Sequence, residues 1–195
     1  MPLFFPGEVH QSKYFFFVPE SVINKRTEKG YSYDQWVRDG SLIVTPGNVT
    51  DYNFVKAKIL EICELYDVKS IGYDRWNASQ LVIDLVEEKI PMSPFGQGYA
   101  SMSAPTKQLE KMVINKEINH AGNAVMRWMI SNVMIKPDPA GNIKVDKAKS
   151  KEKIDGVVGL IMAIGEWMID GRPQESVYET RGIVSIEDFD NFETL

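Results

Sequence analysis

The sequence has little of the side-chain chemistry from which disulfides, thiolate metal sites and cysteine nucleophiles are built. Cys63 is the only cysteine among 195 residues, and there are two histidines. A single cysteine excludes an internal disulfide, which fits a reducing cytoplasm. A metal site in this chain would therefore have to use carboxylates, which are the hard oxygen ligands that Mg²⁺ and Mn²⁺ prefer.

A long unbroken apolar run is also missing. The longest apolar stretch, residues 154–169, is interrupted by Asp155, Gly156, Gly159, Gly165 and Glu166. It falls short of the roughly 20 clean apolar residues that a membrane span needs, so we expect a core helix and no membrane partner. The first six residues have no basic leader and no small-residue cleavage site after them, and we expect no signal peptide.

Motifs for nucleotide binding and for the common hydrolases are absent. The sequence has no Gly-x-x-x-x-Gly-Lys-Ser/Thr segment, the loop that cradles phosphates in P-loop ATPases. No Ser/His/Asp order and no Cys/His pair stands out either. The chain by itself is therefore not expected to be an ATP-driven motor, and an unrelated transferase or hydrolase has weak support.

Charge is unevenly distributed along a chain whose formal net charge is −5. Residues 136–153 contain six lysines and three acids, whereas the residues after Gly171 contain six acids and two arginines. A basic stretch beside an acidic tail suits a polyanionic partner on one face of the protein. A solvated, lysine-rich loop explains the same pattern equally well.

The order of apolar segments predicts a mixed α/β domain. Short aromatic runs at residues 3–5 and 14–18 are typical of a β-hairpin. After them, expected strands at residues 69–73 and 90–92 alternate with segments of helical periodicity. A hairpin followed by such alternation indicates a mixed β-sheet with helices on its faces.

The expected helices include residues 78–88, a helix beginning at Ser103 or Pro105, and the apolar segment 154–169. A composition of 44% hydrophobic and 25% charged residues is that of one ordinary globular domain. We place this domain at residues 1–171 and an acidic C-terminal tail at residues 172–195.

Two acids stand beside apolar segments that are far apart in the sequence. Asp74 directly follows the expected strand at 69–73, and ligands gather at the carboxyl ends of strands in open α/β sheets. Asp155 is the sole acid in the first two turns of the expected last helix. Each acid alone is also compatible with a helix cap or a dipole-balancing role. Together they predict a carboxylate metal site, and we expect the two side chains to lie close to each other.

Several blocks of the sequence resemble the large-subunit terminases of tailed bacteriophages. The blocks occur in the order and at the spacing of that family and cover nearly the whole chain: residues 33–40, 45–52, 71–78, 122–132, 149–158 and 177–179. The resemblance implies a ribonuclease H-like nuclease that cuts concatemeric viral DNA during genome packaging in the cytoplasm of the bacterial host. It also implies an N-terminal packaging ATPase in the full-length protein, with the portal and the small terminase subunit as further partners.

The resemblance assigns roles to particular residues. Asp74 and Asp155 match metal-binding and catalytic aspartates of the family, with Mg²⁺ or Mn²⁺ as the cofactor. Lys149, Lys151 and Lys153 would contact the backbone of double-stranded DNA, because lysines near phosphates act as unspecific electrostatic contacts. Arg75 and His120 are weaker candidates for phosphate contacts.

One departure from the family concerns its first metal-binding aspartate, which lies on the first strand of the fold. No residue here matches it, and the nearest acids, Glu8 and Glu20, lie in loop-like sequence. We therefore expect a ribonuclease H-like fold without its first strand and a nuclease that is impaired in this chain. The alternative is a non-catalytic DNA-binding or portal-docking module, such as a prophage remnant. A sheet that lacks a strand also has an open edge, so self-association is a further expectation.

Overall fold

The computed structural model describes residues 1–75 and 80–170, except for the side chain of Asp170. Its strands are β1 (Pro2–Phe5), β2 (His10–Tyr14), β3 (Phe17–Pro19), β4 (Ile43–Thr45), β5 (Ile71–Asp74), β6 (Met92–Phe95), β7 (Ile118–Asn119), β8 (Ile135–Pro137) and β9 (Ile143–Val145). Its helices are α1 (Glu20–Thr27), α2 (Tyr33–Arg38), α3 (Tyr52–Leu65), α4 (Gln80–Glu87), α5 (Tyr99–Ile114), α6 (Ala124–Ser131) and α7 (Asp155–Asp170).

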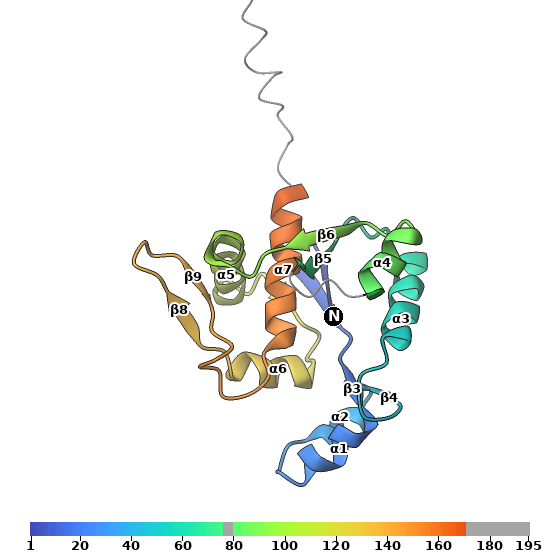
Figure 1. Cartoon of the computed structure of the whole chain (residues 1–195). Helices are drawn as coiled ribbons and strands as arrows, with labels where there is room; N and C mark the ends of the chain where they lie inside the picture. The colour runs from blue at the N-terminus through green and yellow to red at the C-terminus, as the bar shows by residue number, and fades with distance from the viewer. Residues whose placement is uncertain (76–79, 171–195) are drawn as a thin grey trace, which may run out of the picture.

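Helix α7 is the centre of the molecule (Figure 1). It packs against β1 and β5 on one side and against α5 and α6 on the other. Its residues from Val157 to Met162 are buried apart from Gly159, as expected for a helix that is apolar nearly all round. The expectation of a core helix at residues 154–169 is confirmed. Among the described residues, no helix is long and apolar enough to cross a membrane.

Two glycines let aromatic rings approach α7 closely. A Cβ atom at Gly156 would lie 2.7 Å from the ring of Phe16, and one at Gly165 would lie 2.6 Å from the ring of Phe95. These distances are too short for any real side chain, so the glycines set how near β6 and the β2–β3 connection lie to the helix. Phe16 and Phe95 are both buried in the main core.

The N-terminal hairpin forms, but its second strand lies earlier in the sequence than the predicted residues 14–18. Strand β1 pairs antiparallel with β2, with Pro2 opposite Tyr14. Residues 14–18 are not one strand, because β2 ends at Tyr14 and Phe17 begins β3, which pairs in parallel with β4. The chain changes partner at this point: Phe15 N–H still donates to Met1 C=O, whereas Phe16 C=O accepts from Ile43 N–H.

Two other boundaries differ from the sequence-based expectation. Strand β6 occupies residues 92–95 and not 90–92, in parallel register with β5. Helix α5 begins at Tyr99 and carries Pro105 inside it, although Pro105 was expected at the helix start. Proline removes one backbone donor there. The next residue, Thr106, donates its hydroxyl to the C=O of Met102 at 2.6 Å.

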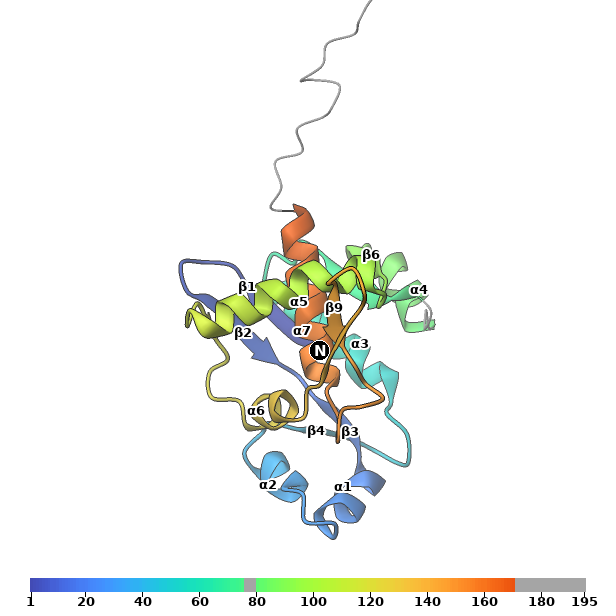
Figure 2. The same cartoon turned by 90° about the vertical axis from the view of Figure 1, so that its left-hand side faces the viewer.

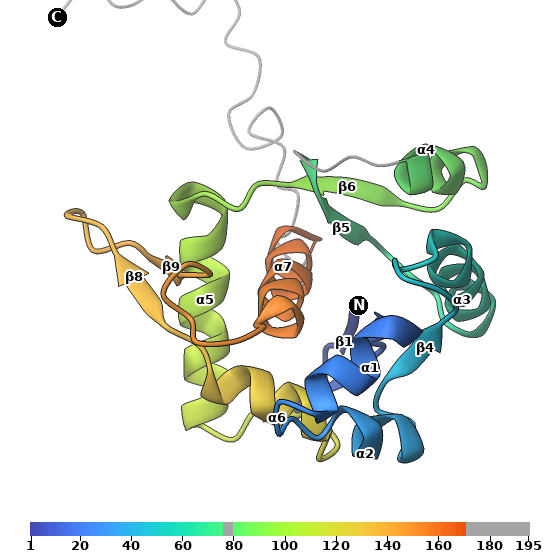
Figure 3. The same cartoon turned by 60° about the horizontal axis from the view of Figure 1, so that its bottom comes forward.

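The mixed α/β architecture is confirmed, with its strands divided among small sheets. Within residues 1–75 and 80–170, the hydrogen-bonded orders are β1-β2-β7, β3-β4, β5-β6 and β8-β9. Strands β1 and β5 both pack on α7, yet they are not hydrogen-bonded to each other. Helices α3 and α4 lie beyond them on the side away from α5, and the β8–β9 hairpin extends outward next to α5 (Figures 2 and 3).

Candidate metal centre

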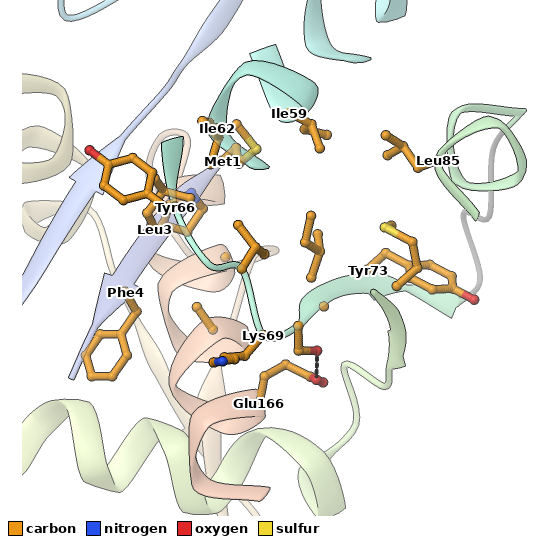
Figure 4. A pocket seen from close by; sticks show the side chains of 18 of the residues that line it. Met1, Leu3, Phe4, Ile59, Ile62, Tyr66, Lys69, Tyr73, Leu85 and Glu166 are labelled. Carbon is orange, nitrogen blue, oxygen red and sulfur yellow. Dashed lines mark hydrogen bonds between the residues drawn. The ribbon is translucent and has the colours of Figure 1, made fainter. Parts of the chain in front are cut away.

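A cavity of about 610 Å³ separates β1 from β5. Helix α7 lines one side of it, and α3 and α4 contribute Ile59, Ile62 and Leu85 (Figure 4). Asp74 and Asp155 both belong to the lining. The two residues are 81 positions apart in the sequence and contribute to one lining, and the closeness of their carboxylates stays a prediction.

Asp74 is positioned by the parallel pair β5–β6. It is the last residue of β5, lies opposite Phe95 in the register and is half-buried. Because Phe95 is buried and packs against Gly165 of α7, the end of β5 is anchored to the central helix. This anchoring fixes the position of the Asp74 backbone relative to α7.

Asp155 is positioned by the first turn of α7. The helix starts at this residue, directly after the buried Ile154, whose C=O accepts hydrogen bonds from the N–H groups of Val157 and Val158. The side chain of Asp155 is exposed, and one of its oxygens lies 3.4 Å from Nζ of Lys147. Both partners are at least half exposed, so this ion pair is weak and is easily exchanged for another cation.

A site with three or more ligands is not formed around Asp74 or Asp155 within the part of the chain that the structure describes. No group of three or more histidine, cysteine or acidic side chains that would suit a metal is found there. Glu166 also lines the cavity, but it lies eleven residues after Asp155 on α7, about 16 Å further along the helix axis at 1.5 Å per residue. Two carboxylates alone would leave a divalent ion with most of its water ligands, and they would not suffice for a cluster of two ions.

Glu166 has a structural explanation. It is buried, and its two carboxylate oxygens accept hydrogen bonds from the hydroxyl groups of Ser70 and Ser93 at 2.5 and 3.1 Å. The missing side chain of Gly72 makes room for it, because a Cβ there would lie 3.2 Å from Cγ of Glu166. The carboxylate thus fastens α7 to β5 and β6.

The lysine loop, residues 146–153, leads into α7. Lys149, Lys151 and Lys153 are all exposed. Glu152 holds the end of the loop that is nearest to α7. Its carboxylate accepts a hydrogen bond from the Tyr31 hydroxyl and lies 3.0 Å from Nη1 of Arg26. The Tyr31 hydrogen bond, together with the charge of Arg26, lowers the pKa of Glu152 below its ordinary value.

Arg75 and His120 are not among the residues that line the cavity. Arg75 is exposed directly after β5 and borders the undescribed residues 76–79. His120 lies between β7 and α6, with its Nδ1 buried and without a hydrogen-bond partner among the described residues. Their proposed phosphate contacts stay predictions.

Two residues of the site were missed by sequence reasoning. Lys147 contributed only to a charge count, although it is the cation that faces Asp155. Glu166 was noted only as an interruption of an apolar run, although it ties α7 to two strands. An acid at a buried position of an otherwise apolar helix is a signal for a buried hydrogen-bond network. No comparable signal marks Lys147, because loop spacing does not tell which way a side chain points.

Comparison with known proteins agrees with this architecture. The family described as "Terminase large subunit, endonuclease domain" matches residues 10–170. The large terminase subunit of Enterobacteria phage HK97 is 36% identical over 154 residues, which are 77% of this chain and 31% of that protein. Protein YmfN of Escherichia coli K12 is 32% identical over 161 residues, covering 79% of this chain and 35% of YmfN.

A solved structure supports the same assignment. The crystal structure of the HK97 large terminase matches with a TM-score of 0.75 and 35% identity, over 81% of this chain and 34% of that one. The chain spans about a third of the length of these relatives. The ribonuclease H-like α/β fold expected from the resemblance is confirmed. The chain therefore belongs to the terminase large subunit endonuclease domain family.

Proposed function

We propose that this chain is the metal-dependent endonuclease domain of a phage terminase large subunit, which cuts concatemeric double-stranded DNA in the cytoplasm of the bacterial host. Asp74 and Asp155 would hold Mg²⁺ or Mn²⁺ and would be its catalytic carboxylates. The observation that carries the proposal is their placement, one at the end of β5 and one at the start of α7, in the lining of a single cavity.

A bound divalent ion would supply Lewis-acid stabilisation of the charge that develops on a phosphodiester during hydrolysis. The residues of this chain hold the carboxylates in place: β6 and α7 fix Asp74, and the buried first turn of α7 fixes Asp155. Lys147 lies 3.4 Å from one carboxylate oxygen of Asp155 and balances part of its charge. Two nearby carboxylates without a cation would repel each other, which favours metal uptake.

DNA would be bound through its backbone. Lys149, Lys151 and Lys153 are exposed on the loop that ends at Asp155, so phosphates held there would lie beside the proposed metal. Such contacts are unspecific and depend strongly on salt. Arg75 and His120 are secondary candidates for the same role. Because the chain covers only about a third of its relatives, the ATPase domain, the portal and the small terminase subunit are proposed as partners of the longer protein.

Nuclease activity of this chain is expected to be low, since two carboxylates position a divalent ion poorly and positioning is a large part of catalysis by metal ions. A version extended upstream, so that a further strand with an aspartate is added, should cut plasmid DNA with Mg²⁺ or Mn²⁺. In that version Asp74→Asn and Asp155→Asn should each lower the cleavage rate by about two orders of magnitude or more.

Plasmid nicking and linearisation measure this, with metal binding followed separately by Mn²⁺ titration. Asp34→Asn is the matched control, because Asp34 lies on α2 and pairs with Arg38. Cleavage that survives both substitutions in the cavity would refute the assignment of the site. Robust cleavage by residues 1–195 alone, lost in either variant, would instead show that two carboxylates suffice.

A further inference from the structure

The geometry points to a pocket for one phosphate group between the β8–β9 hairpin and α7, beside the candidate metal centre and distinct from it. The pocket has a volume of about 300 Å³, and its lining contains a lysine from each of three segments: Lys136 of β8, Lys144 of β9 and Lys147 of the lysine loop. That the phosphate belongs to the DNA backbone rests on the proposed function, whereas binding of a phosphate group by the pocket does not.

Two of these lysines form a like-charged pair across the hairpin. Lys136 lies directly opposite Lys144 in the antiparallel register of β8 and β9. Residues that are directly opposite place their side chains on the same face of the ladder, where like charges repel each other. Both residues also line the pocket, so the two positive charges are gathered at one place. A bound anion would attract both ammonium groups and offset their repulsion.

Lys144 is held in position by the segment that leads into α5. Its Nζ donates to the C=O of Gln97 at 3.2 Å and lies 5.1 Å from the centroid of the Tyr99 ring. An ammonium group has three N–H donors, and Gln97 accepts from one of them. Lys136 is exposed, and its side chain forms no hydrogen bond or ion pair with residues 1–75 and 80–170. One lysine is thus fixed in place, and the other is available to a ligand.

Lys147 connects the pocket with the candidate metal centre. Its Nζ lies 3.4 Å from an oxygen of Asp155 in a weak, largely exposed ion pair. Asp146 is the only acid among the described residues of the lining, and one of its oxygens already accepts hydrogen bonds from the N–H groups of Ala148 and Lys149 at 3.0 and 3.3 Å. Three lysines and one aspartate give the lining a net charge of +2.

A phosphate group suits this lining better than other ligands. A cation would be repelled, and a neutral molecule would leave the lysine charges unbalanced. The oxygens of one phosphate group can accept hydrogen bonds from several ammonium groups, and lysine is a common phosphate ligand in proteins. Ligand pockets have volumes of roughly 300–1,000 Å³, so a pocket at the lower end of this range suits one compact group.

The position of the pocket favours a phosphate of the DNA backbone. Lys147 lines the pocket and contacts Asp155, so a phosphate held there would lie next to the proposed metal and not on it. DNA bound along the lysine loop would then place one phosphate in the pocket and another at the metal. The pocket would thereby position the DNA relative to Asp155.

Inorganic phosphate is the first probe, and it is used without divalent ions so that the metal centre does not take part. At about ten times its Kd, phosphate should raise the Tm of the unchanged protein by roughly 3–6 °C more than sodium chloride of equal ionic strength. Lys136→Gln and Lys144→Gln should each lose this rise. Without phosphate, Lys136→Gln should unfold at the same temperature as the unchanged protein or at a higher one, because it removes the like-charged pair.

Lys25→Gln is the matched control, since Lys25 is exposed on α1 outside the pocket lining. Phosphate at high concentration stabilises folded proteins in general, and this control measures that general effect. If Lys136→Gln and Lys144→Gln respond to phosphate as Lys25→Gln does, the pocket does not bind phosphate and the proposal is overturned.

Duplex DNA, again without divalent ions, distinguishes a backbone phosphate from free phosphate. A variant with both Lys136→Gln and Lys144→Gln should flatten the plot of log affinity against log salt by about 0.9, the effect of one phosphate that is no longer neutralised. The double variant Lys25→Gln and Lys29→Gln is the control. If the pocket variants lose the phosphate response but bind DNA as this control does, the ligand is free phosphate and its assignment to DNA is wrong. Cleavage enters neither measurement, so the outcome is independent of the proposed nuclease activity.

Discussion

Glu152 connects the lysine loop to the N-terminal part of the protein through two different interactions. The Tyr31 hydroxyl donates to one carboxylate oxygen, and Arg26 lies 3.0 Å from the other. Arg26 also stacks on the Tyr31 ring, with 5.1 Å between the guanidinium carbon and the ring centroid. Both side chains of the ion pair are only 22% exposed, so water screens this contact less than it screens the pair of Lys147 and Asp155.

This contact gives the protein a specific sensitivity to acid. The pKa of Glu152 is lowered in the folded protein, first by the Tyr31 hydrogen bond. A carboxyl group with a lowered folded-state pKa stabilises the fold above its unfolded pKa, and this stabilisation is lost as the pH falls through the folded pKa. We therefore expect Tyr31→Phe to lose less stability than the unchanged protein when the pH is lowered from about 6 to about 3.

Urea unfolding at a series of pH values measures the difference. Tyr52→Phe is the control, because Tyr52 is 59% exposed and lies on the surface of α3. Parallel pH profiles for Tyr31→Phe and the unchanged protein would show that the hydrogen bond does not contribute to the acid dependence.

At the scale of elements, the position of α7 depends on close contacts at its glycines. Gly165 faces the ring of Phe95, and a Cβ atom added at Gly165 would lie only 2.6 Å from carbon atoms of that ring. The ring is buried and cannot move without disturbing the core around it. Because β6 carries Phe95 and β5 carries Asp74 in register with it, a shift of this contact would also move the candidate metal centre.

Gly165→Ala should destabilise the protein by about 1–3 kcal/mol, the usual effect of overpacking a dense core. Alanine has the higher helix propensity, so propensity alone would predict the opposite sign. Chemical denaturation measures the change. Gly98→Ala is the control, since a Cβ at Gly98 would meet nothing within 4 Å. If Gly165→Ala stabilises the protein, the Phe95 ring moves aside for the added methyl group at little cost in free energy.

The elements differed in how well the sequence predicted them. Residues 154–169 were predicted well, because a long apolar segment with an acid at its start is typical of a core helix. The start of α5 was predicted wrongly, since Pro105 is typical of a first turn, yet the helix tolerates it in its seventh position. Strand partners were the least predictable. The sequence of residues 14–18 contains no signal that Phe17 leaves the hairpin and pairs with Ile43.

At the scale of the whole molecule, the fold places two acids that are far apart in the sequence in the lining of one cavity. Asp74 and Asp155 were each predicted from their own surroundings, and the cavity lining contains both. The sequence did not predict that Lys147 would face Asp155 or that Glu166 would be fastened by Ser70 and Ser93. Those interactions cross a loop or join segments far apart in the sequence, and periodicity carries no information about either.

The net charge of −5 and the position of the lysine loop predict how the protein binds DNA. The six acids and two arginines after Gly171 account for most of this negative charge, so the domain itself is nearly neutral. Binding should therefore be weak and should concentrate at the exposed loop. Replacing Lys149, Lys151 and Lys153 with alanine should weaken binding at low salt. It should also flatten the plot of log affinity against log salt by about 0.9 for each phosphate that the protein no longer neutralises.

Titration of duplex DNA at several salt concentrations checks this expectation. A control variant that replaces three exposed lysines outside the loop, Lys25, Lys29 and Lys111, removes the same charge from other surfaces. If both triple variants flatten the salt dependence equally, the loop has no special role and only net charge matters.

The central position of α7 has a consequence for the order in which the protein acquires its structure. Strands β1 and β5 and helices α5 and α6 all bury apolar surface against a helix that begins only at Asp155. On the ribosome, these earlier elements would leave the exit tunnel without the partner that covers them. The β2–β7 pairing places His10 opposite Ile118, which closes a very long loop. Folding is therefore expected to be slow and largely post-translational, with apolar surface exposed to chaperones until α7 has been synthesised.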